Sequence, residues 1–230
     1  MHLLYIRMTR KEIYLGLGWL AVLLLSGFLF PADSSARSAF FFQGAHFLAA
    51  MLIFHRFLRS SLEVPLTPFS RILKSALLGL ILAQLANLLT NDLLYYFFPK
   101  YFGYGETGPY FVNISKELTK ALLEEQFFLT AVRIAFFVPI AEELFHRGLV
   151  FGNLVQKNTV LAYTVSVLLY AFLPIIPLLG HYSPDYIVIS FIQYLPIGIL
   201  FSWIYTRTET ILTPILAHIL MNGVSIFTMR

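Results

Sequence analysis

Residues 141–148 read AEELFHRG, a charged cluster inside a long apolar run. Apolar residues flank it from position 127 to 140 and again from Leu149, with Thr130 and Arg133 as the polar exceptions. An ionised side chain near the centre of a bilayer costs about 2.5–3.5 kcal/mol on insertion scales. Charges in such a place are therefore expected either to neutralise one another or to take part in chemistry.

The composition is that of an integral membrane protein. The 230 residues are 58% hydrophobic and 12% charged, with a mean hydropathy of +0.76, whereas a soluble domain carries about 25% charged residues. The absence of cysteine excludes disulfides, thiolate nucleophiles and Cys-based zinc sites. The net charge of +4 comes largely from basic residues beside apolar stretches, which is typical of topogenic signals. We therefore expect a compact domain in contact with the lipid bilayer, and no nucleic-acid partner.

Seven apolar stretches approach the roughly 20 residues that a helix needs to cross a bilayer. They cover residues 13–30, 39–57, 72–98, 127–155, 159–180, 186–205 and 210–228. Each is expected to be a helix, because lipid offers no other partners to backbone polar groups outside a closed barrel. The sequence thus predicts an all-α, polytopic membrane helix bundle of about seven transmembrane helices, the first of them retained and not cleaved as a signal peptide.

Basic residues between these stretches predict the orientation. The inner set has nine members and the outer set five if the N-terminus lies inside, and the positive-inside rule favours this arrangement. The inner set is Arg7, Arg10, Lys11, Arg56, Arg59, Arg71, Lys74, Lys157 and Arg207, and the outer set is Arg37, Lys100, Lys116, Lys120 and Arg230. We expect a multi-pass protein of the plasma or inner membrane with its C-terminus outside. In the polar connection 99–126, an amphipathic helix is expected from Ile114.

Helical spacing separates the roles of the two adjacent carboxylates. Glu143 and Arg147 are four residues apart, so on a helix they share a face in the favourable acid-before-base order. Glu142 is rotated from Glu143 by about 100° and is left free to accept a proton from water. Pro139, shortly before it, is expected to open the hydrogen-bond ladder of the helix.

A second polar pair lies on the last apolar stretch. His218 and Asn222 are four residues apart and share a helix face. Both can donate a hydrogen bond to a developing oxyanion, and His218 can also act as a base or bind a metal. Alone, such a pair is more often a packing contact between membrane helices. Counted at ~1.5 Å per residue from the expected inner helix ends, Glu142 is about 22 Å deep and Asn222 about 20 Å deep, so the two faces can meet.

The ordered combination of Glu-Glu-x-x-x-Arg at residues 142–147 and His-x-x-x-Asn at residues 218–222 resembles the CPBP family. That family covers type II CAAX prenyl endopeptidases and bacteriocin-processing or immunity relatives. The resemblance extends over about residues 125–226. It divides a single membrane domain into generic N-terminal transmembrane helices, residues 1–110, and a CPBP-like catalytic helix core, residues 111–230.

The resemblance implies an intramembrane endopeptidase that acts on a protein or peptide substrate near the inner leaflet. Carried over residue by residue, it implies that Glu142 activates the water and that Glu143 and Arg147 support it. His218 and Asn222 would then stabilise the oxyanion.

The resemblance leaves the cofactor open between zinc and none. Glu142 and His218 are the candidate metal ligands, with His181 as a weaker one. One histidine and two glutamates make a thin zinc site, since catalytic zinc usually has three protein ligands. A metal-free glutamate mechanism is the alternative.

One position departs from the family pattern. On the intervening helix the family places a histidine four residues after an aromatic residue, where this chain has Tyr170 and Pro174. His181 follows seven residues later and would reach the site only if the prolines folded that end of the helix inward. His146, beside the first motif, is another candidate for the second imidazole.

Three functions remain open from the sequence. The first is an intramembrane endopeptidase. The second is a catalytically inactive relative, a membrane scaffold or an immunity or binding protein in which Pro174 replaces the family histidine. The third is a small transporter or channel that uses the buried glutamates for proton coupling, which the lack of internal repeats disfavours.

Overall fold

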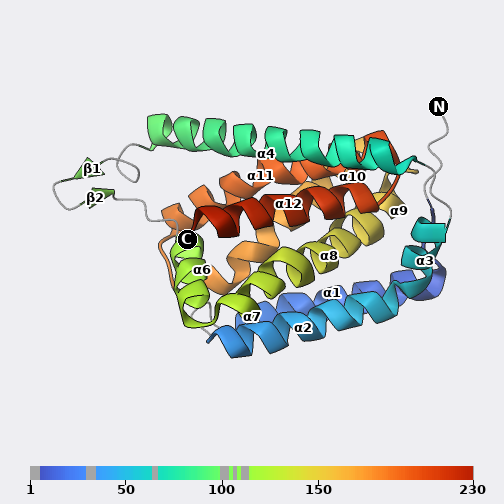
Figure 1. The fold of residues 1–230 in the computed structure, drawn as a ribbon, viewed down its shortest axis with the longest axis horizontal. Helices are drawn as coiled ribbons and strands as arrows, with labels where there is room; N and C mark the ends of the chain where they lie inside the picture. Colours follow the sequence, from blue (N-terminus) through green and yellow to red (C-terminus); the bar gives the residue numbers. More distant parts are fainter. Residues whose placement is uncertain are drawn as a thin grey trace.

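The fold is a bundle of long helices, which Figure 1 shows lying side by side. This computed structural model describes residues 6–29, 35–63, 67–98, 104–105, 108–109 and 114–229. Within these ranges the exception to helix and turn is a small antiparallel pair, β1 (Tyr104–Gly105) with β2 (Gly108–Pro109). The expected all-α bundle is thereby confirmed, apart from this two-residue pairing in the polar connection.

Helix covers most of the described part of every apolar stretch named above. The long helices are α1 (Arg10–Leu29), α2 (Ala36–Ile53), α4 (Phe69–Phe97), α10 (Thr159–Phe172) continued by the 3₁₀ turn η3 (Leu173–Leu178), α11 (Pro184–Thr208) and α12 (Leu212–Thr228). Two shorter helices are α3 (His55–Glu63) and α6 (Ile114–Glu125), and α6 is the amphipathic helix expected from Ile114. By length and composition four segments of the described chain can cross a membrane: Ala36–Ile53, Phe69–Phe97, Thr159–Leu178 and Pro184–Thr208. The full count of seven stays a prediction.

The charged motif lies on a continuous helix that contains two π-helical segments, and we call its residues 127–154 the site helix. Its parts are α7 (Phe127–Val132), the π-helical η1 (Arg133–Phe137), α8 (Val138–Glu143), the π-helical η2 (Leu144–Phe151) and α9 (Gly152–Leu154). In η1 the N–H of Val138 donates to the carbonyl of Arg133, five residues back. The next residue, Pro139, has no N–H to continue this pattern, so the carbonyl of Ile134 is left without a donor from its own helix.

The site helix occupies the middle of the bundle. Figure 1 shows it between the α1–α2 pair on one side and α12 on the other, and contacts with α1, α2, α10 and α12 agree. Every residue from Leu144 to Phe151 is buried. Glu143, His146 and Arg147 are buried, so these ionisable groups face protein, which is where such groups are tolerated in membrane proteins.

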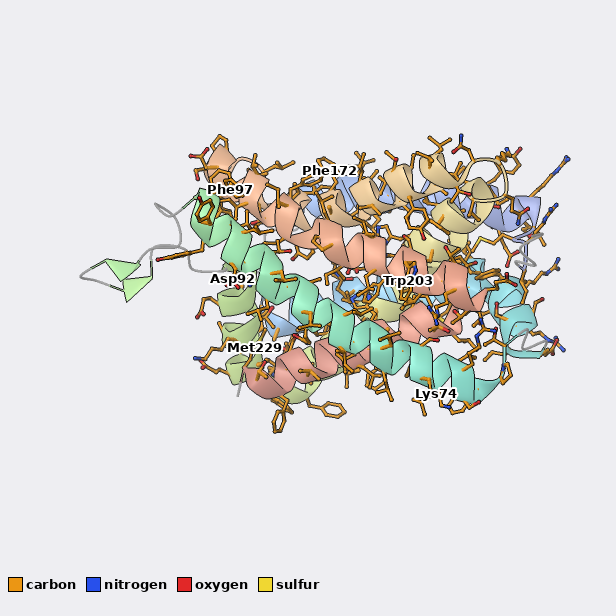
Figure 2. The ribbon with its side chains drawn as sticks, turned by 90° about the horizontal axis from the view of Figure 1, so that it is seen from above. Lys74, Asp92, Phe97, Phe172, Trp203 and Met229 are labelled. Carbon is orange, nitrogen blue, oxygen red and sulfur yellow. The ribbon has the colours of Figure 1, made fainter. Side chains whose placement is uncertain are left out.

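Three basic residues of the predicted inner set, Arg71, Lys74 and Arg207, line one surface pocket at one end of the bundle. That end holds the start of α4 and the end of α11, which are joined by hydrogen bonds from Thr67 Oγ1 to the Thr208 carbonyl at 2.5 Å and from Arg71 Nη2 to the Arg207 carbonyl at 3.1 Å. Figure 2 shows Lys74 near this end of α4, with Asp92 and Phe97 toward the other. The topology, in which this end faces the inside of the cell, stays a prediction.

Candidate active site

Glu143 and Arg147 form an ion pair that is closed to solvent. Both side chains are 0% exposed, and Arg147 Nε lies 3.3 Å from Glu143 Oε2. Arg147 Nη1 also donates to Glu143 Oε1 at 3.3 Å. The pair expected from the four-residue spacing is present, and it neutralises the carboxylate inside the bundle.

Arg147 has further partners around its guanidinium. Nη2 donates to the carbonyl of Gly198 at 3.0 Å. The guanidinium carbon lies 4.4 Å from the ring centroid of Tyr170 and 5.4 Å from that of Phe201. A carboxylate, a carbonyl and two π faces together stabilise the buried cation, as a desolvated charge requires.

At Gly198 of α11 the backbone lies close to side chains of α10 and leaves little room for a Cβ atom. A Cβ atom there would lie 3.2 Å from Tyr170 Cδ1 and 3.3 Å from Val167 Cγ1. Overpacking of this kind costs about 1–3 kcal/mol, so Gly198→Ala should lower the thermal unfolding temperature in detergent. The matched control is Gly18→Ala on α1, where a Cβ would meet nothing within 4 Å. It should leave stability unchanged or raise it by up to about 1 kcal/mol. Equal unfolding temperatures for the two variants would contradict the described packing.

His218 of α12 bridges the two glutamates. Its Nδ1 lies 3.0 Å from Glu143 Oε1 and its Nε2 lies 4.0 Å from Glu142 Oε2. An ionised carboxylate only accepts hydrogen bonds, so Nδ1 carries a hydrogen and donates the bond to Glu143. The convergence of the first motif with the last helix is therefore confirmed, although the direct hydrogen bond goes to Glu143 and not to Glu142.

Glu142 differs from its neighbour in access. Its side chain is 31% exposed, whereas that of Glu143 is 0% exposed. The distance of 4.0 Å to His218 Nε2 exceeds that of a direct hydrogen bond. Glu142 is thus the carboxylate that remains open to a small molecule, as its position on the helix predicted.

Asn222 has a structural partner that the sequence did not reveal. Its Nδ2 donates to the carbonyl of Ile134 at 2.9 Å. This is the carbonyl that Pro139 and the π turn leave without a donor on the site helix. One amide hydrogen of Asn222 is therefore committed to that carbonyl, and the second remains available for the oxyanion role expected above.

A cavity of about 400 Å³ opens beside these groups. Its polar lining includes Glu142, His146, Tyr170, His218 and Asn222, and side chains of α1, α2, α6 and η3 also line it. A neighbouring cavity of about 440 Å³ also has Tyr170 and Asn222 in its wall. It is lined by neutral polar residues of α4 and α11: Gln84, Asn87, Thr90, Asn91, Ser190 and Gln193.

The two candidates for a second imidazole, His146 and His181, differ in whether they line the 400 Å³ cavity. Pro174 lines the 400 Å³ cavity. His181 is exposed, in the turn after η3, and does not line that cavity, so the prolines do not carry it to the site. His146 does line the cavity and is 2% exposed.

The described residues do not fit a zinc centre. Within them no group of three His, Asp or Glu side chains is arranged to hold a metal ion. Glu142 and His218 face each other, but Glu143 and His218 Nδ1 are engaged with each other, and His181 lies elsewhere. Two available ligands fall short of the three protein ligands of catalytic zinc sites, and we derive no step through a metal.

A comparison with models of known protein families finds a match to the part of the chain that holds the candidate active site. Residues 124–224 match the family model described as type II CAAX prenyl endopeptidase Rce1-like. The match includes the whole site helix and ends on α12, just after Asn222. No curated protein and no solved structure matches the chain. Residues 124–224 are therefore similar to the type II CAAX prenyl endopeptidase Rce1-like family, in agreement with the motif resemblance.

Proposed function

We propose that the protein is an intramembrane endopeptidase in which Glu142 activates water. The observation that carries the proposal is an open carboxylate beside an imidazole, with Glu142 Oε2 and His218 Nε2 4.0 Å apart in a cavity inside the bundle. The family of the matched segment supports the reaction class. An acid and an imidazole in one enclosed site are suited to general acid–base chemistry.

The reaction uses the chain's own groups at each step. Glu142 takes a proton from water as the water oxygen bonds to the carbonyl carbon of the scissile peptide. The carbonyl oxygen becomes an oxyanion, which the Nε2–H of a protonated His218 and the second amide N–H of Asn222 stabilise. The carbon–nitrogen bond then breaks, and the proton held by Glu142 passes to the leaving amine.

Glu143 and Arg147 act as positioning residues in this scheme. Glu143 accepts from both Arg147 and His218, so it fixes the imidazole ring with Nε2 toward Glu142. Arg147 in turn is held by the Gly198 carbonyl at 3.0 Å. Preorganised groups of this kind need no rearrangement during the reaction.

The neighbouring cavity supports a polypeptide as substrate. Inside a bilayer every backbone N–H and C=O needs a partner. The amide side chains that line this cavity offer both donors and acceptors, and Gln193 Nε2 already donates to Asn91 Oδ1 at 3.0 Å. We propose that an extended segment of substrate lies here, next to Glu142.

A non-catalytic binding protein is the second candidate function. The observation that favours it is Pro174, which lines the cavity where the family resemblance expects a histidine. In that case the Glu143, Arg147 and His218 contacts would be purely structural. The two functions differ in whether bound peptide is cut.

A cleavage assay separates them. The probe is a quenched peptide that ends in a farnesylated cysteine, two aliphatic residues and methionine, and the enzyme is reconstituted in lipid vesicles. Wild type should release both fragments, identified by mass spectrometry, and His218→Ala should be slower by on the order of 10²-fold. Equal cleavage by both proteins contradicts the proposed role of His218. Binding of the intact peptide without cleavage by wild type would favour the second function.

A further inference from the structure

A surface pocket between the start of α4 and the end of α11 is lined by basic residues, and we call it the basic pocket. Its volume is about 360 Å³, and its charged lining is Arg71 and Lys74 of α4 and Arg207 of α11. Ser70 and Ser75 also line it. Among the described residues no acidic side chain lines the pocket, and none of the three cations is paired with a carboxylate. Three positive charges without a counter-charge favour an anionic ligand.

Two contacts hold the guanidinium groups of the basic pocket in place. Arg71 Nη2 donates to the carbonyl of Arg207 at 3.1 Å, which ties α4 to α11 at the pocket. The guanidinium carbon of Arg207 lies 5.3 Å from the ring centroid of Trp203. The first contact uses one N–H of Arg71 and the second uses a face of the Arg207 guanidinium, so both groups keep N–H donors for a ligand. A guanidinium presents its donors as a planar fork, which matches the oxygens of a phosphate group.

The same face of α4 continues from the basic pocket as an apolar surface. Leu78, Ile81 and Leu85 follow Lys74 at intervals of four, three and four residues, so they lie on one face of the helix. All three are exposed, and we call them the apolar track. Leu78 belongs to both features, because it also lines the basic pocket. A ligand that fills the pocket and covers the track therefore has an anionic head and an apolar tail.

We propose that the basic pocket binds the phosphate of an anionic phospholipid, whose acyl chains lie along the apolar track. The phosphate oxygens accept hydrogen bonds from Arg71 and Arg207, and the ammonium group of Lys74 adds a third positive charge. Basic pockets between membrane helices are suited to anionic lipid headgroups. A free phosphate ion has the same head chemistry, but it would leave the apolar track uncovered. The basic pocket shares no described lining residue with the cavity of Glu142, so the inference does not depend on peptide cleavage.

Trp203 is a natural reporter beside the pocket, because the chain has only two tryptophans. Trp19→Phe leaves Trp203 as the single tryptophan and keeps an aromatic ring against His46. Bromine atoms on an acyl chain quench tryptophan fluorescence on contact. In phosphatidylcholine vesicles, brominated phosphatidylglycerol should quench Trp203 at a mole fraction about tenfold lower than brominated phosphatidylcholine does, or lower still, since each cation near an anionic headgroup contributes about fivefold. Equal quenching by the two lipids overturns the inference.

Two double variants in this background separate a built site from general attraction to basic residues. Arg71→Gln/Lys74→Gln removes two cations of the pocket, leaves Arg207 on Trp203, and should lose most of the preference for phosphatidylglycerol. The matched control is Lys11→Gln/Arg56→Gln, which removes the same charge from exposed positions of α1 and α3 outside the pocket. Figure 1 shows α3 and the start of α4 at the same end of the bundle. The control should keep the preference of its parent, and an equal loss in the two double variants overturns the inference.

A competition experiment separates the lipid headgroup from a free phosphate ion. Sodium phosphate in excess is compared with sodium chloride at the same ionic strength, because any salt screens exposed charges. The two salts should reduce the quenching equally, and a selective loss in phosphate overturns the assignment to a lipid.

Native mass spectrometry repeats the comparison on the chain with both tryptophans. In detergent with equal amounts of the two lipids, wild type should retain phosphatidylglycerol in preference to phosphatidylcholine, and Arg71→Gln/Lys74→Gln should retain both equally. The same preference in wild type and in this variant contradicts the proposed site.

Discussion

Glu142→Gln is expected to lower kcat for peptide cleavage by about 10²–10⁴-fold, the usual contribution of a general base. Glutamine has nearly the same size and reaches the same cavity, but its amide cannot take a proton from water. Glu142 lies outside the buried ion pair, at 4.0 Å from His218. The substitution should therefore leave the unfolding temperature and the KM nearly unchanged. Initial rates in vesicles, together with thermal unfolding of the same preparation, measure both effects.

The control is the same chemical change at an exposed position. Glu124 lies near the end of α6 and is exposed. Glu124→Gln should cleave the peptide as wild type does, because this carboxylate does not line the cavity. A Glu142→Gln variant that keeps more than about a tenth of the wild-type rate would show that another group is the base, since a lost base costs at least about 10²-fold.

Arg147→Met should be the most destabilising single substitution in the site. It leaves the Glu143 carboxylate at 0% exposure without its cation. Breaking a buried ion pair on one side costs about 3–5 kcal/mol. For a chain of this length, that loss corresponds to a fall of on the order of 10 °C in the unfolding temperature. Thermal unfolding in detergent is the measurement.

A double substitution tests the physical reason. Glu143→Gln/Arg147→Met removes both charges, so it should be clearly more stable than Arg147→Met alone. If the two variants unfold together, the loss comes from the packing of Arg147 on Tyr170 and Phe201 and not from the unpaired carboxylate. The matched control is Arg59→Met, which breaks an ion pair of the same spacing with Glu63. The side chain of Arg59 is 77% exposed and that of Glu63 is 57% exposed. An exposed pair of this kind contributes about 0–1 kcal/mol.

Local periodicity explains why much of the site could be predicted. A spacing of four residues places Glu143 beside Arg147 in any helix, and the rise per residue puts Asn222 at nearly the same depth as Glu142. Both expectations depend on helix geometry alone. The positions of the long helices follow from apolar length for the same reason.

Other contacts depend on backbone details that no residue pattern encodes. The use of Asn222 by the Ile134 carbonyl requires the π turn before Pro139. The Gly198 carbonyl becomes a partner of Arg147 only through the close approach of α10 and α11. The rise per residue could not decide which of the other histidines lines the cavity, because it says nothing about the direction in which a ring points. These features come from packing between helices and not from the spacing along one of them.

The two wide turns of the site helix have a consequence for insertions and deletions. In a uniform α-helix each added or removed residue rotates all later side chains by about 100°. A π turn accommodates one extra residue within a continuous helix, so η1 (Arg133–Phe137) sets the rotation of Glu142 relative to everything before it. A chain shortened by one residue there would keep its apolar length and both motifs, yet its carboxylate would turn away from His218. The direction of Glu142 is therefore encoded in the number of residues in this segment as well as in their identity.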